Sequence, residues 1–169
     1  MLLMLNSYHQ NTKHSYNSIR TNPNRVDWNN PPNKFKFYSK DYKRISLNSQ
    51  NENYNFLYLI SGISAKKSYP SGEYYLRINP SAGALYPNEV YFQARNVDGF
   101  EDGIYHIEVG TSSVVLLKKL EKNEGIEEIL GLKYSVDGFI FFISSLYFRS
   151  SWKYKNRAFR YCLLDAGHL

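Results

Sequence analysis

The sequence has little of what would support disulfides, a cysteine-based metal site or a membrane span. Among its 169 residues there is a single cysteine, Cys162, which excludes an intramolecular disulfide and a cysteine-cluster zinc site. The most apolar run, residues 139–148, is too short to cross a bilayer. The N-terminus lacks the basic start of a secretory signal. We therefore expect a soluble, cytoplasmic protein with no membrane partner.

Several motifs with a defined mechanism are also absent. There is no G-x-x-x-x-G-K-[ST] phosphate loop, no G-x-G-x-x-G dinucleotide fingerprint and no G-x-S-x-G nucleophile turn. The four histidines form no H-x-x-x-H or H-E-x-x-H pattern, so no metal site is expected. We interpret His106, which falls in a strand-like segment, as a hydrogen-bonded strand histidine rather than a ligand.

The chain contains enough hydrophobic residues to form one core. Hydrophobic residues make up 43% of the chain and aromatic residues 17%, which excludes wholesale disorder. A chain of this length suits one domain. We expect a basic, Asn-rich arm over residues 1–53, wrapping irregularly and docking by its aromatic residues, and one domain over residues 54–169.

Positive charge is concentrated at the two ends of the chain. The formal net charge of +6 divides into +5 over residues 1–53, −3 over residues 54–148 and +4 over residues 149–169. Two separated basic regions suit a phosphate-bearing ligand as well as they suit nucleic acid. No recognised nucleic-acid-binding motif supports the second interpretation, so nucleic acid is not an expected partner.

The apolar periodicity predicts an α+β fold. Strands are expected over residues 89–94, 104–109, 113–120 and 138–146, and helices over residues 8–15, 54–64, 124–132 and 152–169. The almost continuously apolar run 138–146 predicts a central strand buried on both faces. Ser150 or Ser151 offers an N-cap for the last helix, whose apolar stripe continues to Leu169 without a stop signal. We therefore expect a domain that is incomplete at its C-terminal end.

The segment R-I-N-P-S-A-G-A-L-Y-P, residues 77–87, is a candidate ligand site. Its small residues allow a flat ring to lie close to the backbone, and Gly83 permits dihedral angles that other residues avoid. Arg77 and Ser81 can donate hydrogen bonds to phosphate or carbonyl oxygens. The alternative is an ordinary turn or helix entry punctuated by prolines.

A second candidate is S-S-W-K-Y-K-N-R-A-F-R-Y, residues 150–161. Lys153, Arg157 and Arg160 would share one face near the start of the last helix, where the helix dipole favours anions. On this basis we expect Arg157 to bind a cofactor. Lys153 and Tyr154 are two adjacent proton carriers. The alternative is a solvated basic face.

Taken in order, these segments resemble the SagB-type dehydrogenases, a branch of the nitroreductase-like flavoproteins that includes the azoline oxidases. The resemblance rests on Y-H-x-x-T-K, F-K-x-Y, R-x-x-P-S-A-G-A-L-Y-P-x-E-x-Y, G-I-Y-H-I and K-Y-x-x-R-A-F-R-Y-x-L-L-D-A-G-H. It implies an FMN-dependent oxidoreductase, normally a homodimer, on an α-β-α sandwich with a mainly antiparallel central sheet. Members of the family continue well past A-G-H, so the resemblance also implies a fold truncated at its C-terminal end.

The resemblance implies roles for particular residues. Lys153 and Tyr154 match the family's Lys-Tyr pair, and either would take a proton from an azoline ring whose hydride goes to the flavin N5. The substrate would be a modified peptide, with its modifying enzymes as partners, or a small nitro or quinone compound. The alternative is a non-catalytic remnant or half-domain completed by a second polypeptide. The residues expected against the flavin are Arg77, Ser81, Ala82, Gly83 and Ala84.

Overall fold

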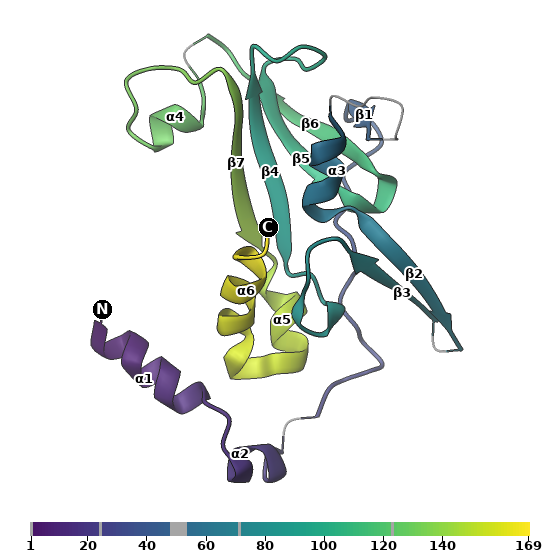
Figure 1. Cartoon of the computed structure of the whole chain (residues 1–169), viewed down its shortest axis with the longest axis vertical. Coiled ribbons are helices and arrows are strands. Elements are labelled where there is room, and N and C mark those ends of the chain that lie inside the picture. Colours follow the sequence, from purple (N-terminus) through teal and green to yellow (C-terminus); the bar gives the residue numbers. More distant parts are fainter. Residues whose placement is uncertain (1, 24, 48–53, 71, 123) are drawn as a thin grey trace.

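A five-stranded antiparallel sheet forms the centre of the fold (Figure 1). The computed structural model describes residues 2–23, 25–47, 54–70, 72–122 and 124–169. The sheet has the order β1-β6-β5-β4-β7. Its strands are β1 (Arg44–Ser46), β4 (Asn88–Arg95), β5 (Gly103–Glu108), β6 (Ser113–Lys119) and β7 (Gly138–Ser145). The four expected strands and the α+β class are confirmed, and β1 is an addition that the sequence did not predict.

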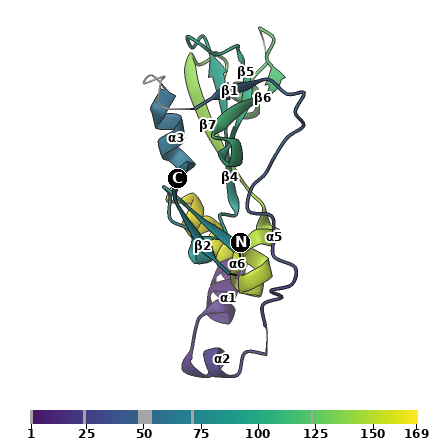
Figure 2. The ribbon, with the colours of Figure 1, turned by 90° about the vertical axis from the view of Figure 1, so that its right-hand side faces the viewer.

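The strand that is buried on both faces is β4 and not β7. All eight residues of β4 are buried, because β5 and β7 pair with its two edges and both faces of the sheet are covered at this strand (Figure 2). β7 lies at the edge of the sheet, and its Phe141 and Ile143 are 40% and 43% exposed. The expectation for residues 138–146 was therefore wrong. An apolar run shows that a strand is hydrophobic but does not show its place in the sheet order.

The two faces of the sheet differ in chemistry. Val90, Phe92 and Ala94 point to the face covered by α3 (Asn55–Ser61), whose Leu57 is fully buried in the same cluster. The extended N-terminal arm crosses the opposite face (Figure 2). The buried polar residues of that face are Glu89, Gln93, Arg95, His106 and Glu108. The sheet therefore has an apolar core on one side and a polar network on the other.

A helical hairpin lies at one end of β4 and β7 (Figure 1). It consists of α5 (Tyr147–Tyr154), a 3-10 turn (Lys155–Arg157) and α6 (Ala158–Ala166). The expected single helix over 152–169 is wrong, because Lys155 has a φ of 51° and ends α5. Ser150 and Ser151 lie inside α5 and do not cap it. α6 ends at Ala166, and the amide of its C-cap Gly167 continues the helical pattern by donating to the Leu163 carbonyl at 3.0 Å.

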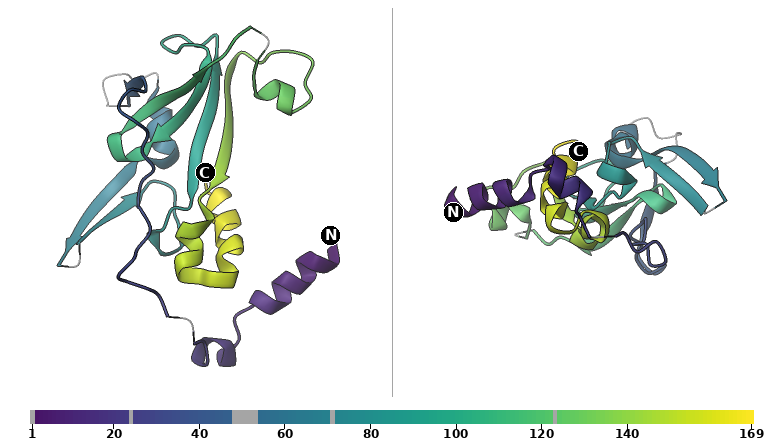
Figure 3. Two further views of the ribbon diagram at one scale, coloured as in Figure 1. Left: turned by 180° about the vertical axis from the view of Figure 1, so that it is seen from behind. Right: turned by 90° about the horizontal axis from the view of Figure 1, so that it is seen from below.

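The remaining elements depart more from expectation. The helix expected over 54–64 ends at Ser61, and an unpredicted hairpin of β2 (Ile63–Tyr69) and β3 (Gly72–Arg77) projects from the body (Figure 3). The helix expected over 124–132 is a single turn, α4 (Ile126–Ile129). The helix expected over 8–15 is instead α1 (Leu2–Thr12), followed by α2 (Tyr16–Arg20). Short 3-10 turns occur at Ala82–Ala84 and Val109–Thr111.

The N-terminal arm is held by donors from the domain as well as by aromatic contacts. Trp28 and Trp152 meet edge to face with ring centroids 5.2 Å apart. Three side chains donate to arm carbonyls: Trp152 to Asp27 at 2.8 Å, Arg149 to Asn33 at 2.9 Å and Arg77 to Lys34 at 3.0 Å. The expected end of the arm, at residue 53, lies outside the described residues. No helix in the described part of the chain is long and apolar enough to span a membrane.

Candidate functional site

The loop between β3 and β4 contains the residues that the sequence singled out, and its backbone is strained. Gly83, Ala84 and Tyr86 have φ values of 65°, 53° and 46°. This left-handed region suits glycine but is unfavourable for other residues. Strained backbone of this kind concentrates at ligand and active sites. The loop is therefore the first place to look for a binding site.

Gly83 lies against the ends of two side chains from α5. A Cβ atom at this position would lie 2.8 Å from Lys153 Nζ and 2.8 Å from Tyr154 OH. The absence of a side chain at Gly83 is what makes room for both polar groups. Burial raises the pKa of Tyr154, and the neighbouring Tyr161 and Asp165 act in the same direction. The Tyr154 phenol therefore stays protonated at neutral pH and can donate a hydrogen bond.

Asp165 of α6 holds the start of this loop. Its Oδ2 accepts a hydrogen bond from Ser81 Oγ at 2.6 Å, and its Oδ1 accepts one from the Ala82 amide at 3.1 Å. Ser81 Oγ in turn accepts a hydrogen bond from the Tyr86 amide at 2.9 Å. The sequence interpretation did not identify Asp165 as a site residue. No local signal reveals this contact, because Asp165 and Ser81 are 84 positions apart.

A pocket of about 510 Å³ opens beside the loop. Its walls come from the arm, β3, the loop and α5, and it is lined by Trp28, Pro31, Pro32, Asn33, Lys34, Phe35, Tyr74, Tyr75, Arg77, Gly83, Ala84, Leu85, Tyr86, Trp152 and Lys153. The lining includes three cationic side chains and no carboxylate. Aromatic rings make up much of the rest. Such a pocket suits a planar, anionic ligand.

Arg77 contributes a buried positive charge to this pocket. The residue is only 5% exposed, and its guanidinium carbon lies 4.8 Å from the centroid of the Tyr86 ring. Burial lowers the pKa of Arg77 to about 10, with Glu89 opposing the shift and Arg149 adding to it. Arg77 is therefore charged at neutral pH. Among the described residues, its Nε has no hydrogen-bond partner, so it retains capacity for an anionic ligand.

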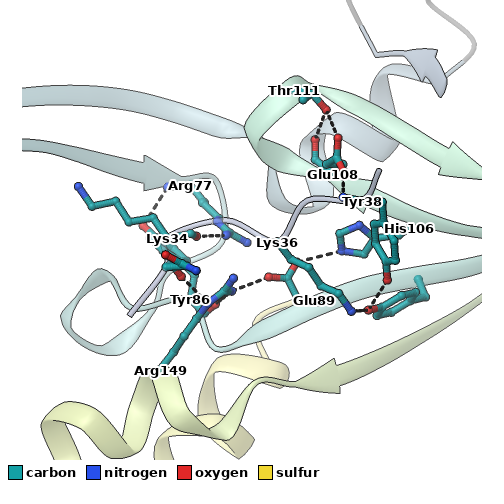
Figure 4. A network of polar contacts seen from close by, with 12 residues as sticks. Lys34, Lys36, Tyr38, Arg77, Tyr86, Glu89, His106, Glu108, Thr111 and Arg149 are labelled. Atoms are coloured by element: carbon teal, nitrogen blue, oxygen red, sulfur yellow. Dashed lines mark hydrogen bonds and ion pairs between the residues drawn. The ribbon is translucent and has the colours of Figure 1, made fainter. Parts of the chain in front are cut away.

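The buried carboxylate of Glu89 joins β4, β5 and α5 through His106 and Arg149 (Figure 4). Glu89 contacts Arg149 NH1 at 2.5 Å and His106 Nε2 at 3.0 Å. Burial pushes the pKa of Glu89 up, but the hydrogen bond with His106 and the charges of Arg149 and Arg77 outweigh it, so the pKa lies below its usual value. Arg149 NH1 also donates to the Tyr86 carbonyl at 2.7 Å. This network therefore supports the loop from beneath, and His106 is a hydrogen-bonded strand histidine.

Arg157 lies elsewhere. Its Nε donates to the Thr12 carbonyl at 2.8 Å, its NH2 donates to the Lys13 carbonyl at 3.1 Å, and its NH1 contacts His14. It does not line the pocket. Arg157 does not share a continuous helix face with Lys153, because the chain turns at Lys155. Its visible role is to hold the end of α1, and a role at a cofactor stays a prediction.

Two further features of the described residues bear on chemistry. No group of three or more His, Cys, Asp or Glu side chains in the described ranges could hold a metal ion. Cys162 is a buried residue of α6. Burial raises the pKa of the Cys162 thiol, against the opposing effect of hydrogen bonds with Ser150 and Ser145. This cysteine is therefore an unreactive thiol at neutral pH.

The class of protein that this fold defines is nitroreductase-like. A solved structure from Anabaena variabilis, described as a "putative nitroreductase", matches with a TM-score of 0.79 and 27% identity, covering 96% of this chain and 36% of that chain. The curated protein "Putative nitroreductase MJ1384" of Methanocaldococcus jannaschii is 33% identical over 94 residues, 53% of this chain and 46% of the relative. The chain thus spans less than half the length of either protein.

A family model gives a different description. The model described as the dipeptidyl peptidase IV (DPP IV) N-terminal region matches residues 2–140, and by that match the chain belongs to the family so described. The match stops before α5 and α6, which bring Lys153, Tyr154 and Asp165 to the loop. The structural match covers 96% of the chain and includes these helices. We therefore follow the nitroreductase likeness for function, and the peptidase description contributes nothing to the site.

Proposed function

We propose that this chain binds FMN and acts in an FMN-dependent oxidoreductase of the SagB type. The observation that supports this most is the pocket, in which Lys34, Arg77 and Lys153 surround an aromatic interior without any lining carboxylate. FMN combines a flat ring system with a phosphate, and these are the two features that such a pocket selects. The aromatic side chains of the lining would pack against the ring, and the buried Arg77 would bind an anionic group.

The groups around Gly83 suit the removal of a proton and a hydride from one substrate. When bound, FMN supplies the acceptor of the hydride. Tyr154, held in its protonated form, would donate a hydrogen bond to the substrate. Lys153 would accept the proton from the substrate carbon, a step that needs its neutral form, so the positive charge offered to the FMN phosphate would come from Lys34 and Arg77. The substrate loses two electrons in total, as in the oxidation of an azoline ring to an azole.

The remaining parts of the proposal follow from the same resemblance. The substrate would be a peptide carrying azoline rings, and its modifying enzymes would be partners. A small nitro or quinone compound is the alternative substrate, because fold likeness alone does not choose between them. We further propose that the protein functions in the cytoplasm as a homodimer, with Ser81, Ala82 and Ala84 beside Gly83 against the flavin.

The test begins with the colour of the purified protein and its affinity for added FMN, measured by quenching of flavin fluorescence. We expect FMN to bind and to be released on denaturation. Lys153→Ala should reduce turnover of an azoline peptide far more than Tyr154→Phe, because only the former removes the proton acceptor. The control is Lys40→Ala, which removes an exposed amine outside the pocket lining. A protein that binds no FMN at any concentration refutes the proposal.

A half-domain that needs a second polypeptide is the competing function, and one observation favours it. Apolar side chains lie uncovered on the edge strand and on α6: Phe141, Ile143, Phe159, Leu163 and Leu164, each at least 40% exposed. Exposed apolar surface of this kind marks an interaction site. This function predicts aggregation of the chain alone and rescue by a second polypeptide. A well-folded, FMN-loaded homodimer of this chain would rule it out.

A further inference from the structure

We infer that Asp165 is a positioning residue, whose carboxylate holds Ser81 and Ala82 so that Gly83 stays against Lys153 and Tyr154. The inference rests on the proposed function only in that FMN is one of its probes. It is carried by hydrogen bonds between α6 and a loop far away in the sequence. The residue is 3% exposed, so water does not compete for these bonds.

Asp165 holds one end of the loop directly and the other end through Ser81. One carboxylate oxygen binds the Ala82 amide, and the other binds the Ser81 hydroxyl. The hydroxyl passes the restraint on, because its oxygen accepts from the Tyr86 amide at the far end of the loop. Ala84 and Tyr86 are held in the left-handed conformation within this loop. Such strain persists only when surrounding contacts over-determine it, and Asp165 provides two of those contacts.

The charge of Asp165 argues for a role beyond packing. Both contacts of its carboxylate within the described residues come from neutral donors, so the buried charge has no ion-pair partner. Burying an unpaired charge is costly, and a neutral acceptor would hold a loop at lower cost. The negative charge acts in the same direction as burial and Tyr161, which raise the pKa of Tyr154. Asp165 thus holds the loop beside Lys153 and Tyr154 and also favours the protonated form of the Tyr154 phenol.

The experiment compares Asp165→Asn with Glu127→Gln. Both variants neutralise a buried carboxylate that holds a loop amide, but Glu127 binds the Val136 amide at 2.9 Å beside α4, away from the pocket. Three properties are measured: amide hydrogen exchange by NMR, the ionisation of Tyr154 in the FMN-free protein, and FMN affinity. If Asp165 had only a structural role, the two variants would change Tyr154 ionisation and FMN affinity to the same extent.

We expect Asp165→Asn to speed exchange of the Ala82 and Tyr86 amides about tenfold, as the loop opens locally. It should also lower the pKa of Tyr154 and weaken FMN binding about tenfold. Glu127→Gln should change exchange at Val136 and at Ile126, whose amide is held by the Gln93 that Glu127 contacts, and should leave Ala82 and Tyr86 unchanged. Unchanged exchange at Ala82 and Tyr86 in folded Asp165→Asn overturns the inference.

A second variant keeps the test decisive if Asp165→Asn does not fold. Ser81→Ala removes the relay to Tyr86 but leaves the Ala82 bond to Asp165 intact. Exchange should then rise at Tyr86 and not at Ala82, and equal exchange at both positions counts against the inference. If the wild-type protein fails to bind FMN, the proposed function fails. Hydrogen exchange and the Tyr154 ionisation still decide the role of Asp165 in that case.

Discussion

Replacing Gly83 by alanine separates the backbone requirement of the loop from its role at the site. Gly83 has a φ of 65°, and an added Cβ would lie 2.8 Å from both Lys153 Nζ and Tyr154 OH. Gly131→Ala is the matched control. Its φ is 70°, and an added Cβ would have nothing within 4 Å. The two substitutions therefore share the backbone change and differ in what the new methyl group meets.

The expected loss of stability is worked from the same two features. Placing a Cβ in the left-handed region costs about 1–2 kcal/mol, and this cost applies to both variants. The contacts at Gly83 are with the ends of flexible side chains, so moving them off their rotamers adds about 0.5–1.5 kcal/mol each at most. For a chain of this size, each kcal/mol lowers the melting temperature by about 2–4 °C.

Thermal unfolding and FMN titration of both variants provide the assay. We expect a melting temperature about 2–8 °C lower in Gly131→Ala, with unchanged FMN affinity. Gly83→Ala should be at least as destabilised and should lose about tenfold or more in FMN affinity, because the methyl group displaces both polar groups. Equal FMN affinity in the two variants, together with an equal loss of stability, would refute the proximity of Gly83 to a binding site.

Three further predictions concern the scaffold. Glu89 has a depressed pKa, so its contribution to the free energy of unfolding is fully present above its ordinary pKa of 4.5 and is lost as the pH falls through the lower native pKa. Urea unfolding at several acidic pH values should show a weaker loss of stability with falling pH in Glu89→Gln than in the wild type. The same pH dependence in both proteins counts against this prediction. Arg149→Met leaves Glu89 buried without its arginine and should lower the free energy of unfolding by about 3–5 kcal/mol. Proteolysis of the N-terminal arm should also be faster, because Arg149 anchors the arm at Asn33. An arm that resists proteolysis as well as in the wild type contradicts this prediction. Phe92→Ala, at a fully buried position, should cost about 3–5 kcal/mol, clearly more than Phe141→Ala at the half-exposed edge, and equal losses would contradict the observed strand order.

Much of the candidate site could be anticipated, because its residues fall in two short segments with distinctive residue types. Gly83 and the Lys153–Tyr154 pair were singled out as two separate segments, and the structure brings them into contact. Arg77 was expected near a ligand and lines the pocket. Arg157 was placed by assuming an unbroken helix. The turn at Lys155, where φ is positive, has no sequence signal. The apolar helical pattern runs on through it, and the sequence therefore predicts one helix where the structure has two.

The sequence by itself determined four of the five strands of the central sheet, the α+β class and the two chemistry-bearing segments, because alternation and residue type are local properties. It also determined the excess of positive charge. Only the tertiary structure decided that β4 and not β7 is central, since sheet order depends on which strands pair. Only the tertiary structure placed Asp165 against Ser81 and Glu89 against Arg149. These contacts join residues far apart in the chain, and no periodicity in either segment specifies its distant partner.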